Sequence, residues 1–164
     1  MEMKEILSKQ SKETRCYIMA AVLVFEGYKG VDELTEVEGE MKLDVLSLTK
    51  EEMEKFPMPK DFSQIVAHLR PISDTDVRHW VITNTYSPVL QSQRKDALRD
   101  FRAFCVALGW NPKEIKEDME LLEDLLEIKP ISSTEGVRAV SKSGCFPIIA
   151  MFVVFAMLLS FTML

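Results

Sequence analysis

The last twenty residues of the chain, 145–164, carry no charged side chain. Their sequence is CFPIIAMFVVFAMLLSFTML, in which Ser160 and Thr162 bear the only hydroxyl groups. A helix satisfies its own backbone hydrogen bonds in lipid, and these two hydroxyls can bond carbonyls of the same helix. A helix of that length spans about 30 Å, the thickness of a bilayer's hydrocarbon core. The segment therefore predicts a C-terminal transmembrane anchor.

The alternative interpretation of this segment is a buried core helix. The last helix of a soluble domain normally keeps a polar face, and residues 145–164 have none. A signal peptide would lie at the N-terminus instead. We therefore expect the chain to contact a lipid bilayer through 145–164, with any chemistry confined to the residues before it.

The charges around this segment predict its orientation. Arg138 and Lys142 precede it, and no charged residue follows it. By the positive-inside tendency, the preceding domain then faces the cytoplasm. The N-terminal residues also lack the pattern of an export signal. We expect a single-pass membrane protein with a cytoplasmic N-terminal domain.

Composition limits the partners of that domain. The 164-residue chain has a formal net charge of −6, whereas nucleic-acid binding needs clustered Lys and Arg, so we expect no nucleic-acid partner. Its three cysteines, Cys16, Cys105 and Cys145, show neither pairing nor metal-ligand spacing, which fits a reducing compartment. Cys16 and Cys105 lie in apolar stretches, which favours small core residues over nucleophiles.

Helical signals dominate residues 1–128, and strand signals are almost absent. We predict an all-α bundle of about six or seven short helices that forms one domain. Residues 12–26 are apolar on nearly every side, which predicts a helix in the middle of the bundle. The other helical segments are expected over residues 2–9, from about 32, and over about 49–56, 61–70, 74–88, 92–108 and 111–128.

Local signals set several helix boundaries. Thr49 and Glu52 form a capping-box pattern. Asn111 is a typical N-cap, and Pro112 suits the first helical position after it. Pro88 is expected to end or kink the helix in which it lies.

The helix expected from residue 32 has two contrasting faces. Its apolar residues recur at helical spacing, at Val31, Leu34, Val37 and Met41. The other face is acidic and carries Asp32, Glu33, Glu36, Glu38 and Glu40. The pattern predicts an amphipathic helix.

Residues 129–144 differ from the rest of the chain. They are rich in Ser and Gly, include Pro130, and show no clear periodicity. This composition predicts a flexible linker between the helical domain and the anchor.

Enzyme signatures are absent from the sequence. The two histidines, His68 and His79, do not fall in an HExxH or comparable pattern. The chain has no nucleophile elbow and no glycine-rich phosphate loop after a strand. We therefore expect no catalytic residue and no enzymatic activity.

Carboxylates flank a glycine-bearing turn, GYKG, at residues 27–30. The candidate metal ligands are Glu26, Asp32, Glu33 and Glu36. Hard divalent cations prefer several carboxylate oxygens brought together by such a turn, although the spacing is not that of an EF-hand. The other interpretation is a solvated acidic face that stabilises the positive end of a helix. The residues alone favour the solvated face.

Two segments carry a resemblance to a known family. They are YIMAAVLVFEGYKGVDELTEVEGEM, residues 17–41, and VRHWVITNTYSPVLQSQRKDALRDFRAFCVALGWNPKEI, residues 77–115. The first resembles the first half of the tellurite-resistance TerB family and its TerB-like relatives, in which an apolar helix ends in an acidic, glycine-bearing turn. The second is similar to that family's A-x-x-L-G-x-S-x-x-E segment. The resemblance covers roughly residues 12–127.

The resemblance implies a pseudo-symmetric bundle of two halves that holds a divalent cation in membrane-associated stress-response assemblies. Glu26 stands where the family has Asp, and Asp32, Glu33 or Glu36 would supply the later acidic ligand. The second half departs from the family at 87–90, where Ser-Pro-Val-Leu replaces the acidic turn. The chain is therefore expected to keep the scaffold, while a metal site that needs both halves is in question.

Three functions remain open from the sequence. The leading one is a non-enzymatic interaction module for envelope or metal and tellurite stress, tethered to a membrane and binding a membrane or cytoplasmic protein. The second is a divalent-cation sensor that uses the four carboxylates above, and the third is an enzyme of unrecognised type acting at the membrane. A candidate partner surface is the aromatic and basic mixture at His79, Trp80, Arg94, Lys95 and Arg99.

Overall fold

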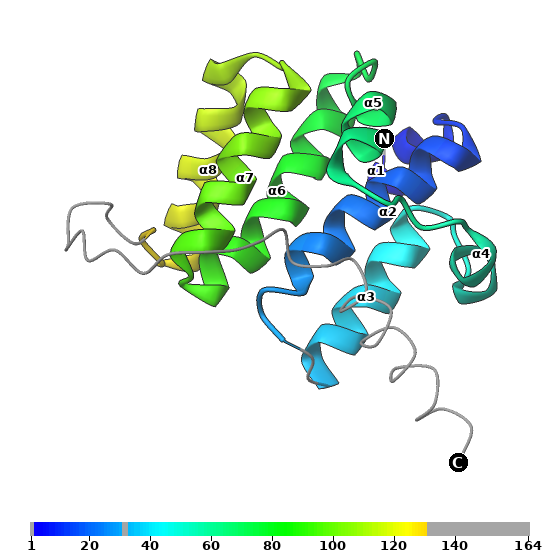
Figure 1. The fold of residues 1–164 in the computed structure, drawn as a ribbon, viewed down its shortest axis with the longest axis horizontal. Helices are drawn as coiled ribbons and strands as arrows, with labels where there is room; N and C mark the ends of the chain where they lie inside the picture. The colour runs from blue at the N-terminus through cyan, green and yellow to red at the C-terminus, as the bar shows by residue number, and fades with distance from the viewer. Residues whose placement is uncertain (1, 31–32, 131–164) are drawn as a thin grey trace.

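The computed structural model describes residues 2–30 and 33–130. In this part of the chain eight α-helices form a bundle, and no strand occurs (Figure 1). The predicted all-α fold is confirmed for these residues. The helices are α1 (Met3–Ser8), α2 (Lys12–Glu26), α3 (Glu33–Val45), α4 (Lys50–Lys55), α5 (Phe62–Leu69), α6 (Thr75–Ser92), α7 (Lys95–Leu108) and α8 (Pro112–Leu126).

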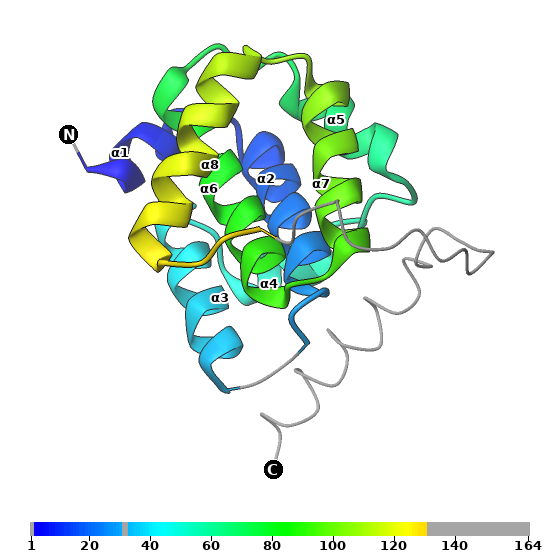
Figure 2. The ribbon, with the colours of Figure 1, turned by 90° about the vertical axis from the view of Figure 1, so that its left-hand side faces the viewer.

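Helices α2 and α6 lie at the centre of the bundle. Helix α2 packs on α5 and α6, and α6 packs in turn on α7 and α8. Figures 1 and 2 show α3 at the margin, below the end of α2. The nearly all-round apolar sequence of α2 explains its place, because Ile18, Ala20, Val22 and Phe25 are completely buried.

Aromatic rings join the central helices. Phe25 of α2 packs edge-on against Phe62 of α5 and Phe101 of α7, with ring centroids 5.7 and 5.6 Å apart. Tyr86 of α6 stacks on Phe101 at 4.9 Å. Such pairs add about 0.5–1.5 kcal/mol each beyond the area that they bury. These rings therefore hold α2, α5, α6 and α7 around one core.

The expected helix starts are confirmed where a side-chain cap marks them. Thr49 accepts from the backbone N–H of Glu52, and Glu52 accepts from that of Thr49, which completes the capping box of α4. Asn111 caps α8 with Pro112 in its first turn. Each such cap stabilises a helix by about 1 kcal/mol.

Pro88 was expected to end or kink its helix, but it does not end it, since α6 continues to Ser92. Pro88 is buried, and the residues beyond it, Val89 and Leu90, belong to the core. Burial of those apolar side chains offsets the proline's cost of about 3 kcal/mol. The next helix, expected from about residue 92, begins at Lys95 instead.

No helix between residues 2 and 130, in the part that the structure describes, combines the length and the apolar character that a bilayer span requires. The anchor predicted at 145–164 lies outside the described residues, as does nearly all of the linker predicted at 129–144.

Candidate functional site

The candidate site is the end of α2, the turn after it and the inner face of α3. We call this region the α2–α3 corner and define it by Glu26, Tyr28, Lys29, Glu38 and Lys42. It contains one of the four predicted metal ligands, Glu26, which is the last residue of α2.

The turn of the corner follows from its glycines. Helix α2 ends at Glu26, and Gly27 is its C-cap. The next two backbone N–H groups still donate to carbonyls of the helix, that of Tyr28 to Phe25 at 3.1 Å and that of Lys29 to Glu26 at 2.9 Å. Gly30 then adopts a φ of +88°, a conformation that side-chain-bearing residues rarely take. This turn places Tyr28 and Lys29 directly beside the end of α2.

Glu26 is buried, with 9% of its surface exposed, and two lysines surround its carboxylate. Lys42 of α3 donates to Glu26 Oε1, and Lys29 Nζ lies 3.7 Å from Oε2. Lys29 Nζ also lies 3.0 Å from Oε2 of Glu38. The two lysine side chains are only 11% and 14% exposed. Two carboxylates and two ammonium groups thus form a charge-balanced cluster beneath α3.

The other predicted metal ligands do not join this cluster in the part that is described. Glu36 is exposed on α3. Glu33 is the first residue of α3, of which only the backbone is described, and Asp32 lies outside the described residues. Among the described residues no three His, Cys, Asp or Glu side chains gather as metal ligands would. The four-carboxylate site stays a prediction.

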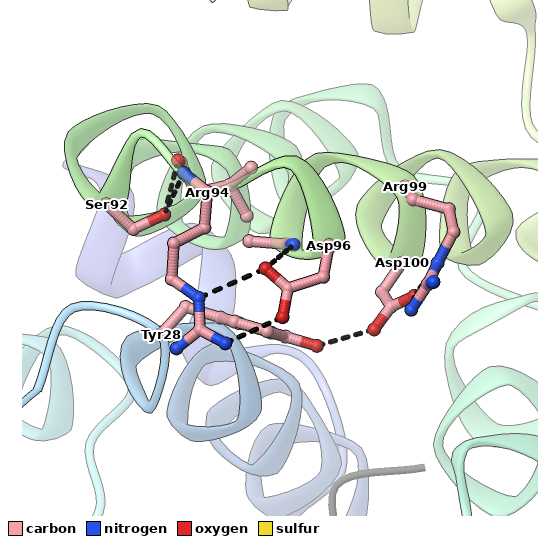
Figure 3. Close-up of polar contacts among 8 residues, drawn as sticks. Tyr28, Ser92, Arg94, Asp96, Arg99 and Asp100 are labelled. Carbon is pink, nitrogen blue, oxygen red and sulfur yellow. Dashed lines mark hydrogen bonds and ion pairs between the residues drawn. The ribbon is translucent and has the colours of Figure 1, made fainter. Parts of the chain in front are cut away.

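Tyr28 extends the corner to α7 (Figure 3). Its hydroxyl donates to Oδ2 of Asp100 at 2.6 Å, and the Arg94 guanidinium lies 5.2 Å from the centre of its ring. Arg94 also forms a two-pronged contact with Asp96, at 3.0 and 2.6 Å. Arg99 completes the group through Asp100, at 2.8 Å. The turn after α2 is therefore fixed to the first half of α7.

Burial and the hydrogen bond to Asp100 raise the pKa of Tyr28 well above its ordinary value. The phenol consequently stays protonated and remains a donor across the physiological range. The hydrogen bonds from Arg94 lower the pKa of Asp96, which keeps that carboxylate charged in the first turn of α7. Tyr28 therefore stays a hydrogen-bond donor, and Asp96 stays a charged acceptor.

The two histidines form contacts between elements. His79 Nδ1 of α6 lies 2.5 Å from Oδ1 of the buried Asp118 of α8. His68 stacks on Tyr17 with ring centroids 3.6 Å apart. The partner surface predicted around His79 thus includes a side chain that links α6 to α8.

The two described cysteines lie in the bundle as expected. Cys16 is buried and Cys105 half-buried. Burial raises the pKa of the Cys16 thiol, and it raises that of Cys105 to about 12. The thiolate is the nucleophilic form of cysteine, so these shifts disfavour reactivity.

A hollow between α6, α7 and Pro130 has a cavity volume of about 10 Å³, room for about one water molecule. Tyr86, Leu98 and Arg94 are among its lining residues. Pockets for drug-sized ligands run from about 300 to 1,000 Å³, so this hollow is small for such a ligand.

Helix α3 directs two of its apolar side chains outward. Val37 and Met41, one turn apart, are 54% and 65% exposed, while Leu43 and Val45 of the same helix pack against the core. Lys42 and Glu38 take part in the charged cluster on the inner side of the helix. The predicted apolar face therefore exists at these two residues, but it points away from the bundle.

The charges of the corner explain this orientation. Burying the exposed parts of Val37 and Met41 would stabilise the fold by about 2–3 kcal/mol. Leaving Glu26 buried without its lysine would cost about 3–5 kcal/mol. The ion pairs, together with Leu43 and Val45 packed against the core, therefore outweigh the apolar gain and hold the inner face of α3 against the bundle.

Comparison of the chain with protein-family models, with curated proteins and with solved structures finds no match. The class of protein that the structure defines is an all-α bundle over the described residues. The TerB resemblance remains an expectation from the sequence.

Of the five members of the corner, only Glu26 was predicted as a site residue, whereas Tyr28, Lys29, Glu38 and Lys42 were not. A signal for the lysines was present, because they lie three and sixteen positions after Glu26. A buried carboxylate at a helix end needs a cation beside it, but the prediction gave these lysines no role.

Proposed function

We propose that the chain is a non-enzymatic interaction module: a TerB-like helical domain, residues 1–128, held at the cytoplasmic face of a membrane by 145–164. A tether confines a domain to one surface and raises its effective concentration toward partners there. This mechanism needs no catalytic group. Its physiological setting would be an envelope or metal and tellurite stress response, as the resemblance implies.

The outward apolar face of α3 is the observation that carries this proposal. Single exposed apolar residues are common, but the arrangement here is a helix with inward charges and outward Val37 and Met41. The described polar groups of the corner contact one another across helices, as Tyr28 and Asp100 do. That supports a structural use for them and leaves the surface for binding.

Deletion of 145–164 tests the modular part of the proposal. We expect the remaining chain to be soluble, monodisperse and helical by gel filtration and far-ultraviolet circular dichroism, because the described residues form a continuous apolar core among themselves. An aggregated or melted truncation would contradict an independent domain.

A divalent-cation sensor is the second candidate, and one observation favours it. Glu26 Oε2 is buried and accepts no hydrogen bond from the described residues. Lys29 and Lys42 supply the nearby positive charge, so a cation would have to displace an ammonium group. Calorimetry of the full chain with calcium, zinc and manganese separates the two: heat of binding favours the sensor, and its absence at millimolar ion removes it.

A further inference from the structure

Acidic residues border the apolar pair on α3. Glu36, Glu40 and Asp44 are all exposed and follow one another at four-residue spacing. That spacing forms a row along the helix, parallel to the row of Val37 and Met41. The outward face of α3 therefore consists of an apolar row with an acidic row beside it.

The acidic row is only partly neutralised within the chain. Glu40 pairs with Lys50 and Asp44 with Lys4, each at 2.7 Å, and these pairs are largely exposed to solvent. Exposed pairs of this kind contribute little stability and exchange partners readily. The row can consequently offer its charge to another molecule.

The position of α3 is fixed before any partner arrives. Lys42 holds its inner face to Glu26, and Arg15 of α2 donates to the carbonyls of Leu46 and Ser47 just after it, at 2.6 and 2.8 Å. A surface presented on a fixed helix loses little conformational freedom on binding.

We propose that this face of α3 binds a basic amphipathic helix of another protein. The inference rests on the proposed function as an interaction module and names its surface and partner. Apolar side chains at i and i+4 are the usual anchors of helix-on-helix recognition, and Met41 adapts to varied partners. Lysines or arginines beside the partner's apolar stripe complement the acidic row.

Charge disfavours the other occupants of this face. A second copy would bring its own acidic row against the first, and an anionic lipid surface would repel the acidic row. The segment 145–164 has no charge with which to engage the row. A basic amphipathic helix can contact the apolar row with its apolar stripe and pair with the acidic row through its lysines or arginines.

The test measures binding of a synthetic peptide to the full-length chain in dodecyl maltoside. The probe is a fluorescent 14-residue amphipathic helix of leucine and lysine, followed by anisotropy with detergent alone as the blank. The variant Val37→Glu with Met41→Glu removes the apolar row and adds negative charge. We expect it to weaken binding about tenfold or more, because apolar contact is lost despite the added attraction.

The matched control is Ala103→Glu with Val106→Glu on α7. These residues are also one turn apart and exposed, their replacement adds the same charge, and their neighbours Arg99 and Arg102 are basic. We expect this control to bind as tightly as the wild type. Glu36→Gln with Glu40→Gln should weaken binding severalfold and reduce its salt dependence. Circular dichroism checks that every variant keeps its helices.

Several results would overturn the proposal. Unchanged binding by the α3 variant, or equal losses in the α3 and α7 variants, would remove the specific face. Wild-type dimers that the α3 substitutions convert to monomers would show that a second copy covers it. Faster hydrogen exchange of α3 after deletion of 131–164 would assign it to the chain's own C-terminal segment. None of these bears on membrane attachment, which fails separately if the full chain proves water-soluble.

Discussion

At the scale of single residues, the ion pair of Lys42 and Glu26 has the largest effect on the position of α3. Both side chains are close to nine-tenths buried, so each charge has lost most of its contact with water. A buried ion pair contributes little net stability relative to apolar residues, but removal of one partner leaves an uncompensated charge. The pair therefore specifies the position of α3 more than it stabilises the fold.

Replacement of Lys42 by Met should lower the free energy of unfolding by about 3 kcal/mol, because Glu26 would lose its direct partner. Denaturant unfolding measures this change. The matched control is Lys55→Met, whose exposed pair with Glu51 should matter too little to measure. Equal stability of the two variants would contradict the role assigned to the cluster.

Tyr28→Phe keeps the ring beneath Arg94 and removes only the hydrogen bond to Asp100. The variant should be less stable by about 1 kcal/mol near pH 8. The folded chain raises the pKa of Tyr28, so this contribution is full below the unfolded value of about 10 and falls as the pH rises above it.

The stability difference between wild type and Tyr28→Phe should therefore shrink toward zero near pH 11. Denaturant unfolding of both proteins at the two pH values gives this difference directly. A difference that grows with pH would show that the phenol ionises more readily in the folded chain, contrary to the geometry.

At the scale of elements, two glycines allow the effect of backbone conformation on stability to be tested without a steric clash. Gly109 ends α7 with a φ of +67°, whereas Gly39 lies inside α3, and a Cβ on either would meet nothing within 4 Å. Gly109→Ala should therefore destabilise by about 1 kcal/mol, because alanine disfavours positive φ. Gly39→Ala should stabilise by about 0.5–1 kcal/mol, since α3 gains helix propensity.

Thermal unfolding of the two alanine variants measures both signs in one experiment. Opposite shifts of the melting temperature support the helix assignments at both sites. Destabilisation by Gly39→Ala would contradict an α-helix at that part of α3.

How far sequence predicts such elements depends on how local their causes are. The bounds of α2 and the capping box at Thr49 follow from neighbouring residues, and both were predicted. The contact of Tyr28 with Asp100 joins positions 72 apart, and no local pattern reports it. The sequence did not predict which side of α3 turns inward, for a related reason: periodicity defines a face, whereas contacts with distant residues, such as that of Lys42 with Glu26, decide where the face points.

At the scale of the whole molecule, two parts of the sequence make different demands on the solvent. The described bundle has a continuous apolar core, and the chain as a whole has a formal net charge of −6. Residues 145–164 are uncharged and long enough to cross a bilayer. Joined in one chain, they fit the proposed interaction domain that is confined to a membrane surface.

Fractionation of cells that express the full chain tests this account most directly. We predict that the full chain stays in the membrane pellet after extraction with alkaline carbonate, while a chain lacking 145–164 is found in the supernatant. Recovery of the full chain in the supernatant, with carbonate making no difference, would contradict it.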